Sequence, residues 1–361
     1  MATVMKSPSQ YVQGPGELGR LGQHAKRLGN AFLVICTDTT RARIEAVITE
    51  GLKTADKAVM FCSFKGKSTK DEIARVQAEA EAAGCDVIVG AGGGKTIDVA
   101  KAVADNMNLP VVIVPTVASN DAPCTGLSVI YNDAGVVIKV QYTKRDPDLV
   151  LADSEILAKS PARLFASGIG DALATWFEAR ACFASGGKTL ARGTCPETAL
   201  MLSKLCYDIL MRDGVQAMED VKKGQTTKAV ESVIEASIYL SGVGTESGGL
   251  AAAHAINDSL VYVDPIKNMY HGERVAFGVL AQLVLEKAPE LQDVLRFLKA
   301  TGLPTTFADM GAKNPTEAEL RKVAEAACVP TQFTKNMPFP VSEDDVYNAI
   351  LEADRLGRQS R

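Results

Sequence analysis

Short apolar runs and helical repeats alternate along residues 1–150 of this chain. The apolar runs lie at 32–36, 59–63, 87–89 and 111–114, and each is typical of a buried strand. Residues 70–83 instead repeat the apolar side chains Ile73, Val76 and Ala80 at helical spacing. Strands that alternate with helices predict a mainly parallel, doubly wound sheet.

Two further apolar runs, 128–131 and 136–138, flank the sequence Asn-Asp-Ala-Gly at 132–135. Turn-forming residues between two short apolar runs are typical of a β-hairpin. We expect this hairpin to join the main sheet as an antiparallel addition.

The pattern changes after Asp153. Strand-like runs disappear, and Ala, Leu, Glu and Lys recur at helical spacing to the end of the chain. Ser160 and Pro161 indicate a helix start, with the proline just inside the cap. A chain of 361 residues, 47% of them hydrophobic, is large enough for two domains. We therefore predict an α/β domain at 1–160 and an all-helical domain at 161–361.

A glycine-rich turn follows the apolar run 87–89. Glycine occupies positions 90, 92, 93 and 94, and a helix begins at Lys95. Glycine lets the backbone approach an anion, and the free N–H groups of a first helical turn point at it, so this unit predicts a nucleotide site. The turn is neither a P-loop, which would need glycine at Val89, nor a G-x-G-x-x-G motif, because Lys95 takes the last glycine position. A tight turn without a ligand therefore remains an alternative.

Composition excludes several classes of function. The net charge is -4 and no basic stripe is present, which argues against nucleic-acid binding. No apolar stretch is long enough to cross a bilayer, and the N-terminus lacks the apolar core of a signal peptide, so we expect a cytoplasmic protein without a membrane partner. The eight cysteines form no C-x-x-C pair, which favours reduced, buried thiols.

Histidine is scarce, and two of the three histidines lie in the helical half. His254 and His271 stand in small-residue, apolar contexts, and Asp171 lies in a similar helix. A carboxylate in such a helix is costly unless it is paired or metal-bound. Two imidazoles and one carboxylate would leave a coordination position open, as in catalytic metal sites. No local spacing links the three residues, so ordinary core histidines remain the alternative; His24 is expected on a helix surface.

Several long strings resemble one family, the glycerol dehydrogenases of the group III, or iron-containing, alcohol dehydrogenase superfamily. The matching strings keep the family's order and cover nearly the whole chain. They are Gly-Gly-Gly-Lys-Thr-Ile-Asp at 92–98, Pro-Thr-Val-Ala-Ser-Asn-Asp-Ala-Pro at 115–123, Gly-Ile-Gly-Asp-Ala-Leu-Ala-Thr-Trp-Phe-Glu-Ala-Arg at 168–180, Glu-Ser-Gly-Gly-Leu-Ala-Ala-Ala-His at 246–254 and His-Gly-Glu-Arg-Val-Ala-Phe-Gly at 271–278.

The resemblance implies a fold and an activity. The fold is a doubly wound dinucleotide-binding domain followed by an all-α domain, the dehydroquinate synthase-like arrangement, with the active site in the interdomain cleft. The activity is NAD-dependent oxidation of glycerol, and of related small diols, to the ketone, dihydroxyacetone for glycerol. Asp171, His254 and His271 would bind a divalent metal, zinc or iron. The family also implies a homo-oligomer, an octamer assembled from dimers.

The resemblance also carries residue roles. Asp121 would accept a hydrogen bond from a polyol hydroxyl and act in catalysis with His254 and His271; a turn aspartate before Ala-Pro is the alternative. Asp38 would bind the ribose and disfavour the 2′-phosphate of NADP, and a helix N-cap is its alternative. The remaining expected cofactor residues line the pyrophosphate, adenosine and nicotinamide: Gly93, Gly94, Lys95, Asp98, Thr116, Ser119, Thr125, Leu127 and Tyr131.

Some positions depart from the family. The usual His-Ala-(Ile/Val)-His-Asn is here His254-Ala-Ile-Asn257-Asp258, so a second histidine is replaced by Asn257. In a helix, positions i and i+3 share a face, so Asn257 should lie near the site and affect substrate preference. Other readings on the same fold stay open: a dehydrogenase of another small alcohol or of glycerol-1-phosphate, a 3-dehydroquinate synthase, and, outside enzymes, a non-catalytic NAD-binding protein.

Overall fold

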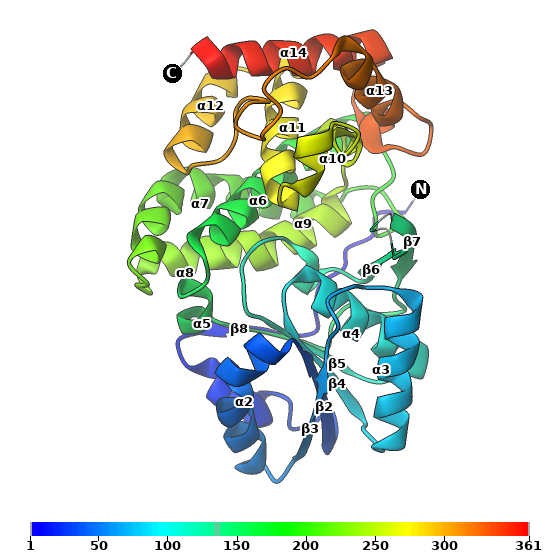
Figure 1. Cartoon of the computed structure of the whole chain (residues 1–361), viewed down its shortest axis with the longest axis vertical. Helices are drawn as coiled ribbons and strands as arrows, with labels where there is room; N and C mark the ends of the chain where they lie inside the picture. The colour runs from blue at the N-terminus through cyan, green and yellow to red at the C-terminus, as the bar shows by residue number, and fades with distance from the viewer. Residues whose placement is uncertain (1, 134, 136, 360–361) are drawn as a thin grey trace.

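The computed structural model describes residues 2–133, 135 and 137–359. Two stacked halves make up the molecule (Figure 1). The first contains a parallel sheet flanked by helices, and the second is a bundle of helices. This arrangement confirms the predicted fold class. Within the described residues, no helix has the length and apolarity needed to cross a membrane.

All six strands of the main sheet run parallel. Their order is β1-β8-β5-β4-β2-β3. The strands are β1 (Tyr11–Gly14), β2 (Ala31–Cys36), β3 (Ala58–Ser63), β4 (Val87–Gly92), β5 (Val111–Pro115) and β8 (Leu149–Asp153). The pattern of apolar runs predicted four of these strands. It missed β1, a four-residue strand at the sheet edge with no continuous apolar run, and β8, although residues 149–152 form such a run.

The chain order reverses beside β2. From β2 the chain moves to β3 on one side and then crosses to β4 on the other, and nucleotides bind outside the carboxyl ends of strands at such a switch point. Helices α1 (Leu21–His24) and α2 (Asp38–Lys53) cover one face of the sheet, and α3 (Lys70–Ala82) and α4 (Gly94–Met107) cover the other. The glycine turn between β4 and α4 therefore opens at the switch point.

The predicted hairpin forms, but not as part of the main sheet. Strands β6 (Leu127–Tyr131) and β7 (Val137–Tyr142) make a separate antiparallel pair. The reason is that β6 packs on α4 and its backbone bonds to Ser68, away from both sheet edges. The expected second run began at residue 136, which lies outside the described residues.

The helical half is organised around a long buried helix. That helix, α6 (Ala162–Ser185), is buried on nearly every side, and its core is continuous with the α3–α4 face of the sheet. Pro161 is the N-cap residue rather than the first helical residue, so the helix begins one residue later than predicted. The other helices are α5 (Ser154–Ala158), α7 (Glu197–Lys222), α8 (Lys228–Ile234), the π-helical segment η3 (Glu235–Leu240), α9 (Ser241–Gly248), α10 (Ala252–Leu260), α11 (His271–Glu286), α12 (Leu291–Ala300), α13 (Glu317–Ala327) and α14 (Glu343–Gln359), with 3-10 turns η1 (Glu17–Arg20), η2 (Ala122–Cys124), η4 (Asp264–Asn268) and η5 (Phe333–Asn336).

The N-terminal segment reaches from the sheet to the helical half. The N–H of Val4 donates to the carbonyl of Thr194, and the N–H of Lys6 donates to Ser247 Oγ at 2.9 Å. The Lys6 ammonium also donates to Asp146 and to Glu246, both at 3.1 Å. The division at residue 160 falls between α5 and α6 and stays a prediction, and residues 2–7 contact both sides of it.

Candidate metal and nucleotide site

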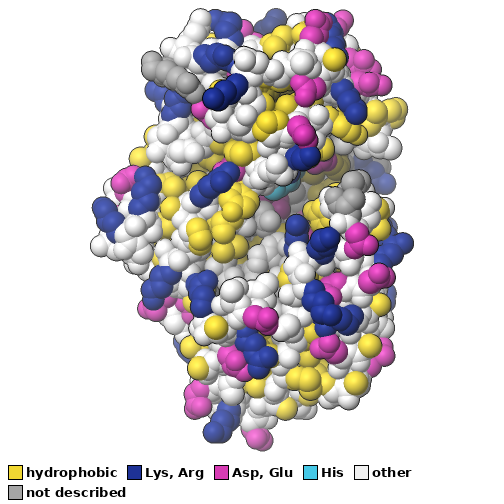
Figure 2. Space-filling view, viewed as in Figure 1, with side chains coloured by type: hydrophobic (Ala, Val, Ile, Leu, Met, Phe, Trp, Pro, Cys, Tyr) yellow, Lys and Arg dark blue, Asp and Glu magenta, His cyan; other side chains and the backbone are white. Residues whose placement is uncertain are grey.

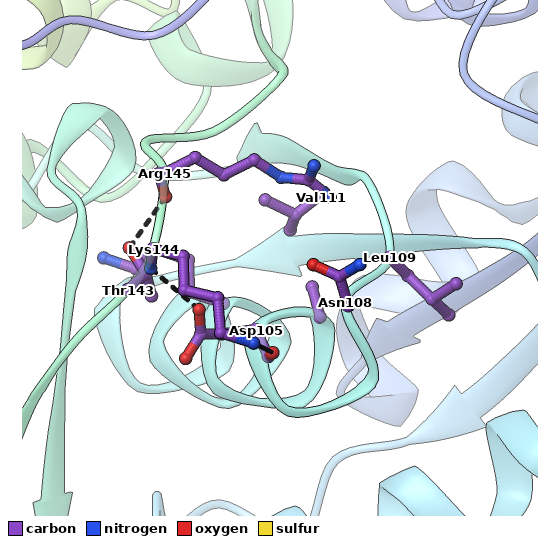
Figure 3. A pocket seen from close by; sticks show the side chains of 9 residues that line it. Asp105, Asn108, Leu109, Val111, Thr143, Lys144 and Arg145 are labelled. Carbon is purple, nitrogen blue, oxygen red and sulfur yellow. Dashed lines mark hydrogen bonds between the residues drawn. The ribbon is translucent and has the colours of Figure 1, made fainter.

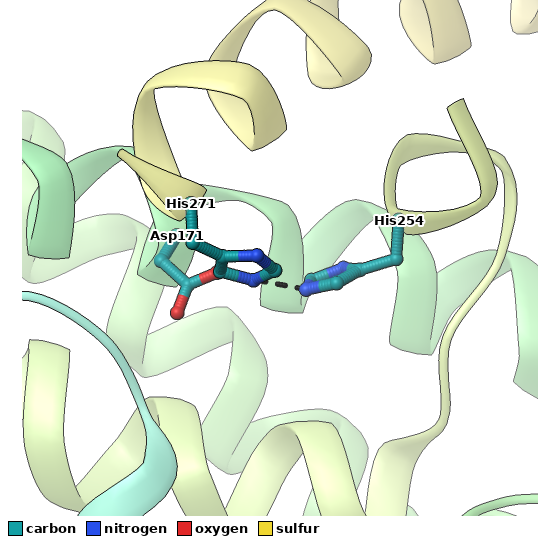
Figure 4. A group of neighbouring side chains, drawn as sticks. All are labelled: Asp171, His254 and His271. Carbon is teal, nitrogen blue, oxygen red and sulfur yellow. Dashed lines mark ion pairs between the residues drawn. The ribbon is translucent and has the colours of Figure 1, made fainter. Parts of the chain in front are cut away.

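Three potential metal ligands converge at one point of the helical half. Asp171 comes from α6, His254 from α10, and His271 is the first residue of α11 (Figure 4). Asp171 Oδ1 lies 3.1 Å from His271 Nε2 and 3.5 Å from His254 Nε2. One ligand atom from each residue lies within 4.8 Å of the others. The structure therefore brings together residues that no local spacing links in the sequence.

Close helix packing places His271 beside Asp171. Gly272 touches α6 so tightly that an ideal Cβ would lie 1.8 Å from the carbonyl oxygen of Ser167. The N–H of Gly272 donates to Ser167 Oγ at 3.2 Å. Glycine after His271 thus lets the start of α11 approach α6 one turn before Asp171.

The charges of this cluster fit a bound cation. Asp171 is buried, and its Oδ1 accepts no hydrogen bond from the described residues, while its Oδ2 accepts the backbone N–H of Asp121 at 3.2 Å. Burial alone would raise the Asp171 pKa, but His271 and His254 outweigh it and hold the pKa below its usual value. A buried carboxylate oxygen without a donor, facing two imidazole nitrogens, suits a divalent metal with an open position.

Glu178 orients His254, and sequence reasoning missed this role. Its Oε2 lies 2.5 Å from His254 Nδ1, and its Oε1 accepts the N–H groups of Ala251 and His254 at 2.9 and 2.8 Å. Donation from Nδ1 to a carboxylate leaves Nε2 free for a metal. Glu178 stands two helical turns after Asp171 on the same helix face, a signal that could have identified it.

His271 has a different neighbour and a more open position. Its side chain is 38% exposed, against 9% for His254. Its Nδ1 lies 3.4 Å from Asn257 Nδ2, and Asn257 Oδ1 accepts a hydrogen bond from Arg274 Nε at 3.1 Å. Asn257 therefore lies beside the metal cluster, by which we mean the three candidate ligands Asp171, His254 and His271, as the helical spacing predicted. A histidine is visible in the hollow between the two halves of the molecule (Figure 2).

Asp121 connects the sheet to the metal cluster. It occupies the N-cap position of the turn η2, but its side chain makes no capping hydrogen bond there. Burial and the nearby charge of Asp171 raise the Asp121 pKa to about 6, against the opposing effects of His254, His271 and a hydrogen bond from Thr245. Asp121 thus lies next to the three candidate metal ligands.

The expected pyrophosphate residues lie at the switch point. Gly93 caps α4 without a side chain, and Gly94 and Lys95 begin the helix. An ideal Cβ on Gly94 would lie 2.7 Å from Asn120 Nδ2, so the turn and the 115–120 segment touch. Thr116 donates its backbone N–H to the Gly92 carbonyl at 3.1 Å, and the Ser119 carbonyl accepts Ser167 Oγ at 3.1 Å.

The other expected cofactor residues are more dispersed. Asp98 is buried, and burial raises its pKa to about 6. Lys95 Nζ lies 5.7 Å from the ring centre of Tyr131, and Leu127 begins the same strand. Thr125 is buried, with its hydroxyl donating to the Ala122 carbonyl at 3.3 Å, so it lies behind the turn.

Asp38 stands apart from the metal cluster, at the carboxyl end of β2. It is exposed, and its Oδ1 accepts a hydrogen bond from Ser63 Oγ at 2.5 Å. Thr37, not Asp38, is the N-cap of α2, because its hydroxyl accepts the N–H of Thr40. The N-cap alternative for Asp38 is therefore wrong. His24 is partly buried rather than on the surface, with Nε2 2.6 Å from Glu17 Oε2.

A separate small pocket lies at the other end of α4. Its lining includes Asp105, Asn108 and Leu109 from the end of the helix and Lys144 and Arg145 from the loop before β8 (Figure 3). These residues stand at the amino ends of the strands, away from the glycine turn. The pocket therefore does not belong to the nucleotide site.

A doubly wound sheet that faces three candidate metal ligands is typical of dehydrogenases that use a nucleotide cofactor and a metal ion. A family model described as iron-containing alcohol dehydrogenase matches residues 8–154. The chain is also 46% identical to the glycerol dehydrogenase of Escherichia coli O6:H1, covering 99% of this chain and 98% of the relative. The chain belongs to the iron-containing alcohol dehydrogenase family.

Within that family, glycerol dehydrogenases are among the most similar proteins. The Pseudomonas putida enzyme is 45% identical, and 99% of each chain is covered. The crystal structure of glycerol dehydrogenase from Schizosaccharomyces pombe superposes with a TM-score of 0.95 at 32% identity, covering 99% of this chain and 92% of that one. The similarity thus extends over both halves of the molecule.

Proposed function

We propose that this chain oxidises glycerol to dihydroxyacetone with NAD and a divalent metal. The observation that carries the proposal is the buried Oδ1 of Asp171, which has no hydrogen-bond donor among the described residues and faces His254 and His271. The high identity to glycerol dehydrogenases over the full chain supports glycerol as the substrate.

Asp171, His254 and His271 would hold the metal, zinc or iron. When bound, such a metal acts as a Lewis acid and lowers the pKa of a substrate hydroxyl. Asp121 accepts a hydrogen bond from a second hydroxyl of the polyol and so fixes which carbon faces the nicotinamide. The backbone N–H of Asp121 already bonds to Asp171, which couples the two positions.

The glycine turn and its neighbours would hold NAD, the hydride acceptor. Gly93, Gly94 and Lys95 place backbone N–H groups and one positive charge at the pyrophosphate. Asp98, Thr116 and Ser119 continue the cofactor path, and Thr125, Leu127 and Tyr131 border its nicotinamide side. Asp38 accepts hydrogen bonds from the adenosine ribose.

Replacing Asp38 with alanine should shift cofactor preference toward NADP. In the wild-type protein the exposed carboxylate repels a 2′-phosphate and binds the ribose. The variant loses both effects, so the NADP-to-NAD ratio of kcat/KM should rise roughly tenfold or more. Initial rates with both cofactors measure this ratio. Thr39→Ala, one residue along the same exposed turn, is the control. An unchanged ratio in Asp38→Ala would remove Asp38 from the ribose site.

The first test of the proposed function is metal removal. NADH formation from glycerol and NAD should disappear on chelation and return when zinc or ferrous ion is added back. Metal-dependent turnover of another diol, but not of glycerol, would keep the site and change the substrate. Bound NADH without turnover of any alcohol would contradict the enzymatic proposal.

A different small diol is the second candidate substrate, and Asn257 is the reason. It replaces the family's second histidine beside His271. A relative that is 40% identical, from Halobacterium salinarum, is a glycolaldehyde reductase. Phosphorylated substrates are not favoured: Arg274 donates to Asn257 and to the carbonyls of Met269 and Lys267, and exposed Lys267 pairs with Asp264. The cytoplasmic location and the homo-oligomer remain predictions.

A further inference from the structure

Lys101 carries a charge in the interior of the nucleotide-binding half. Its side chain is 1% exposed, although lysine is rarely buried without partners. It lies on α4, two turns after the glycine-rich helix start. None of the roles expected from the sequence uses this residue.

The ammonium group of Lys101 spans the turn that follows Asp121. Nζ donates to the Ala122 carbonyl at 3.0 Å and to the Thr125 carbonyl at 3.2 Å, and Thr125 Oγ1 lies at 3.4 Å. Both carbonyls belong to the turn around η2. The fourth neighbour is Asp98 Oδ1 at 3.5 Å, which accepts no hydrogen bond from the described residues.

The opposite side of this turn faces the helical half. The N–H of Asp121 bonds to Asp171, and the Asp121 side chain meets Thr245 of α9. Gly242 packs so closely that an ideal Cβ would lie 2.9 Å from the Asp121 carbonyl oxygen. The turn is thus held by Lys101 on one side and by α6 and α9 on the other.

We propose that Lys101 is a positioning residue for the reaction proposed above, holding the 121–125 turn so that Asp121 meets the substrate beside the metal cluster. This inference rests on the proposed function. The competing explanation is that Lys101 only neutralises buried Asp98 and has no effect on the turn.

Two Lys101→Met variants separate these explanations, one in the wild-type chain and one in an Asp98→Asn background. Methionine has nearly the length of lysine but cannot donate hydrogen bonds to the two carbonyls. Asp98→Asn removes the carboxylate that would be left unpaired. We expect the double variant to melt at a higher temperature than Lys101→Met alone. Its kcat should nevertheless stay about a hundredfold below that of Asp98→Asn, because a small misplacement of a substrate-binding group costs that much. Recovery of kcat to the Asp98→Asn level would overturn the proposal.

Hydrogen exchange gives a readout that needs no substrate. Backbone amides of the peptide 119–127 should exchange faster in both Lys101→Met proteins than in their parents, while KM for NAD changes less than kcat. Unchanged exchange in that peptide would also overturn the positioning role. Failure of the proposed function is separate, because it would appear as absent alcohol oxidation in the wild-type protein while the exchange comparison stands.

Discussion

Replacing His271 with alanine is expected to lower kcat/KM for glycerol about a thousandfold, because a bound metal supplies several kcal/mol to the transition state and each tenfold costs about 1.4 kcal/mol. The Kd for NADH should stay within about twofold, since His271 lies on α11 and the glycine turn on α4. Alanine removes one of three ligands, so the metal bound after dialysis should also fall. Steady-state rates, NADH fluorescence titration and metal analysis measure the three quantities.

The third histidine provides the matched control. His24 pairs with Glu17 on the far side of the sheet from the glycine-turn helix and contacts none of the proposed ligands. His24→Ala should therefore retain its metal and its turnover. Normal activity in His271→Ala would remove this residue from the metal site, and loss of metal in His24→Ala would mean that the loss is not specific.

Local sequence patterns predicted the parts of the fold that depend on neighbours in the chain. The glycine turn at 90–94 is recognisable because strand, turn and helix follow one another directly. The hairpin strands were equally visible, but the place where β6 docks was not, because it depends on contacts with α4 and Ser68. Periodicity reports which side of an element is buried, not which element covers it.

The same distinction between chain neighbours and long-range contacts applies to the candidate site. Residue chemistry suggested Asp171, His254 and His271, but only the resemblance to a family joined them before the structure did. Glu178 and Lys101 act through groups brought to them by folding: the Nδ1 atom of a histidine 76 residues away and carbonyls 21 and 24 residues away. A buried charge in an apolar helix was the available signal for both, because such a charge requires partners.

Replacing Glu178 with glutamine should weaken metal binding about 10–100-fold, the usual effect of losing a carboxylate behind a histidine ligand. A carboxylate can only accept, so it holds the His254 proton on Nδ1 and leaves Nε2 for the metal. A glutamine amide can donate to Nδ1 instead, which would favour the proton on Nε2 and block coordination. Competition with a chromophoric zinc chelator measures the affinity without relying on turnover.

Glu286→Gln is the control for removing a partly buried carboxylate from the same half of the molecule. Glu286 pairs with Arg180 at 2.6 Å and is 11% exposed, but it does not contact a proposed ligand. Both variants lose one negative charge, but of the two carboxylates only Glu178 contacts His254. Equal metal affinities in the two variants would show that Glu178 serves packing alone; a loss confined to Glu178→Gln would establish that this carboxylate selects the imidazole tautomer on which the proposed metal site depends.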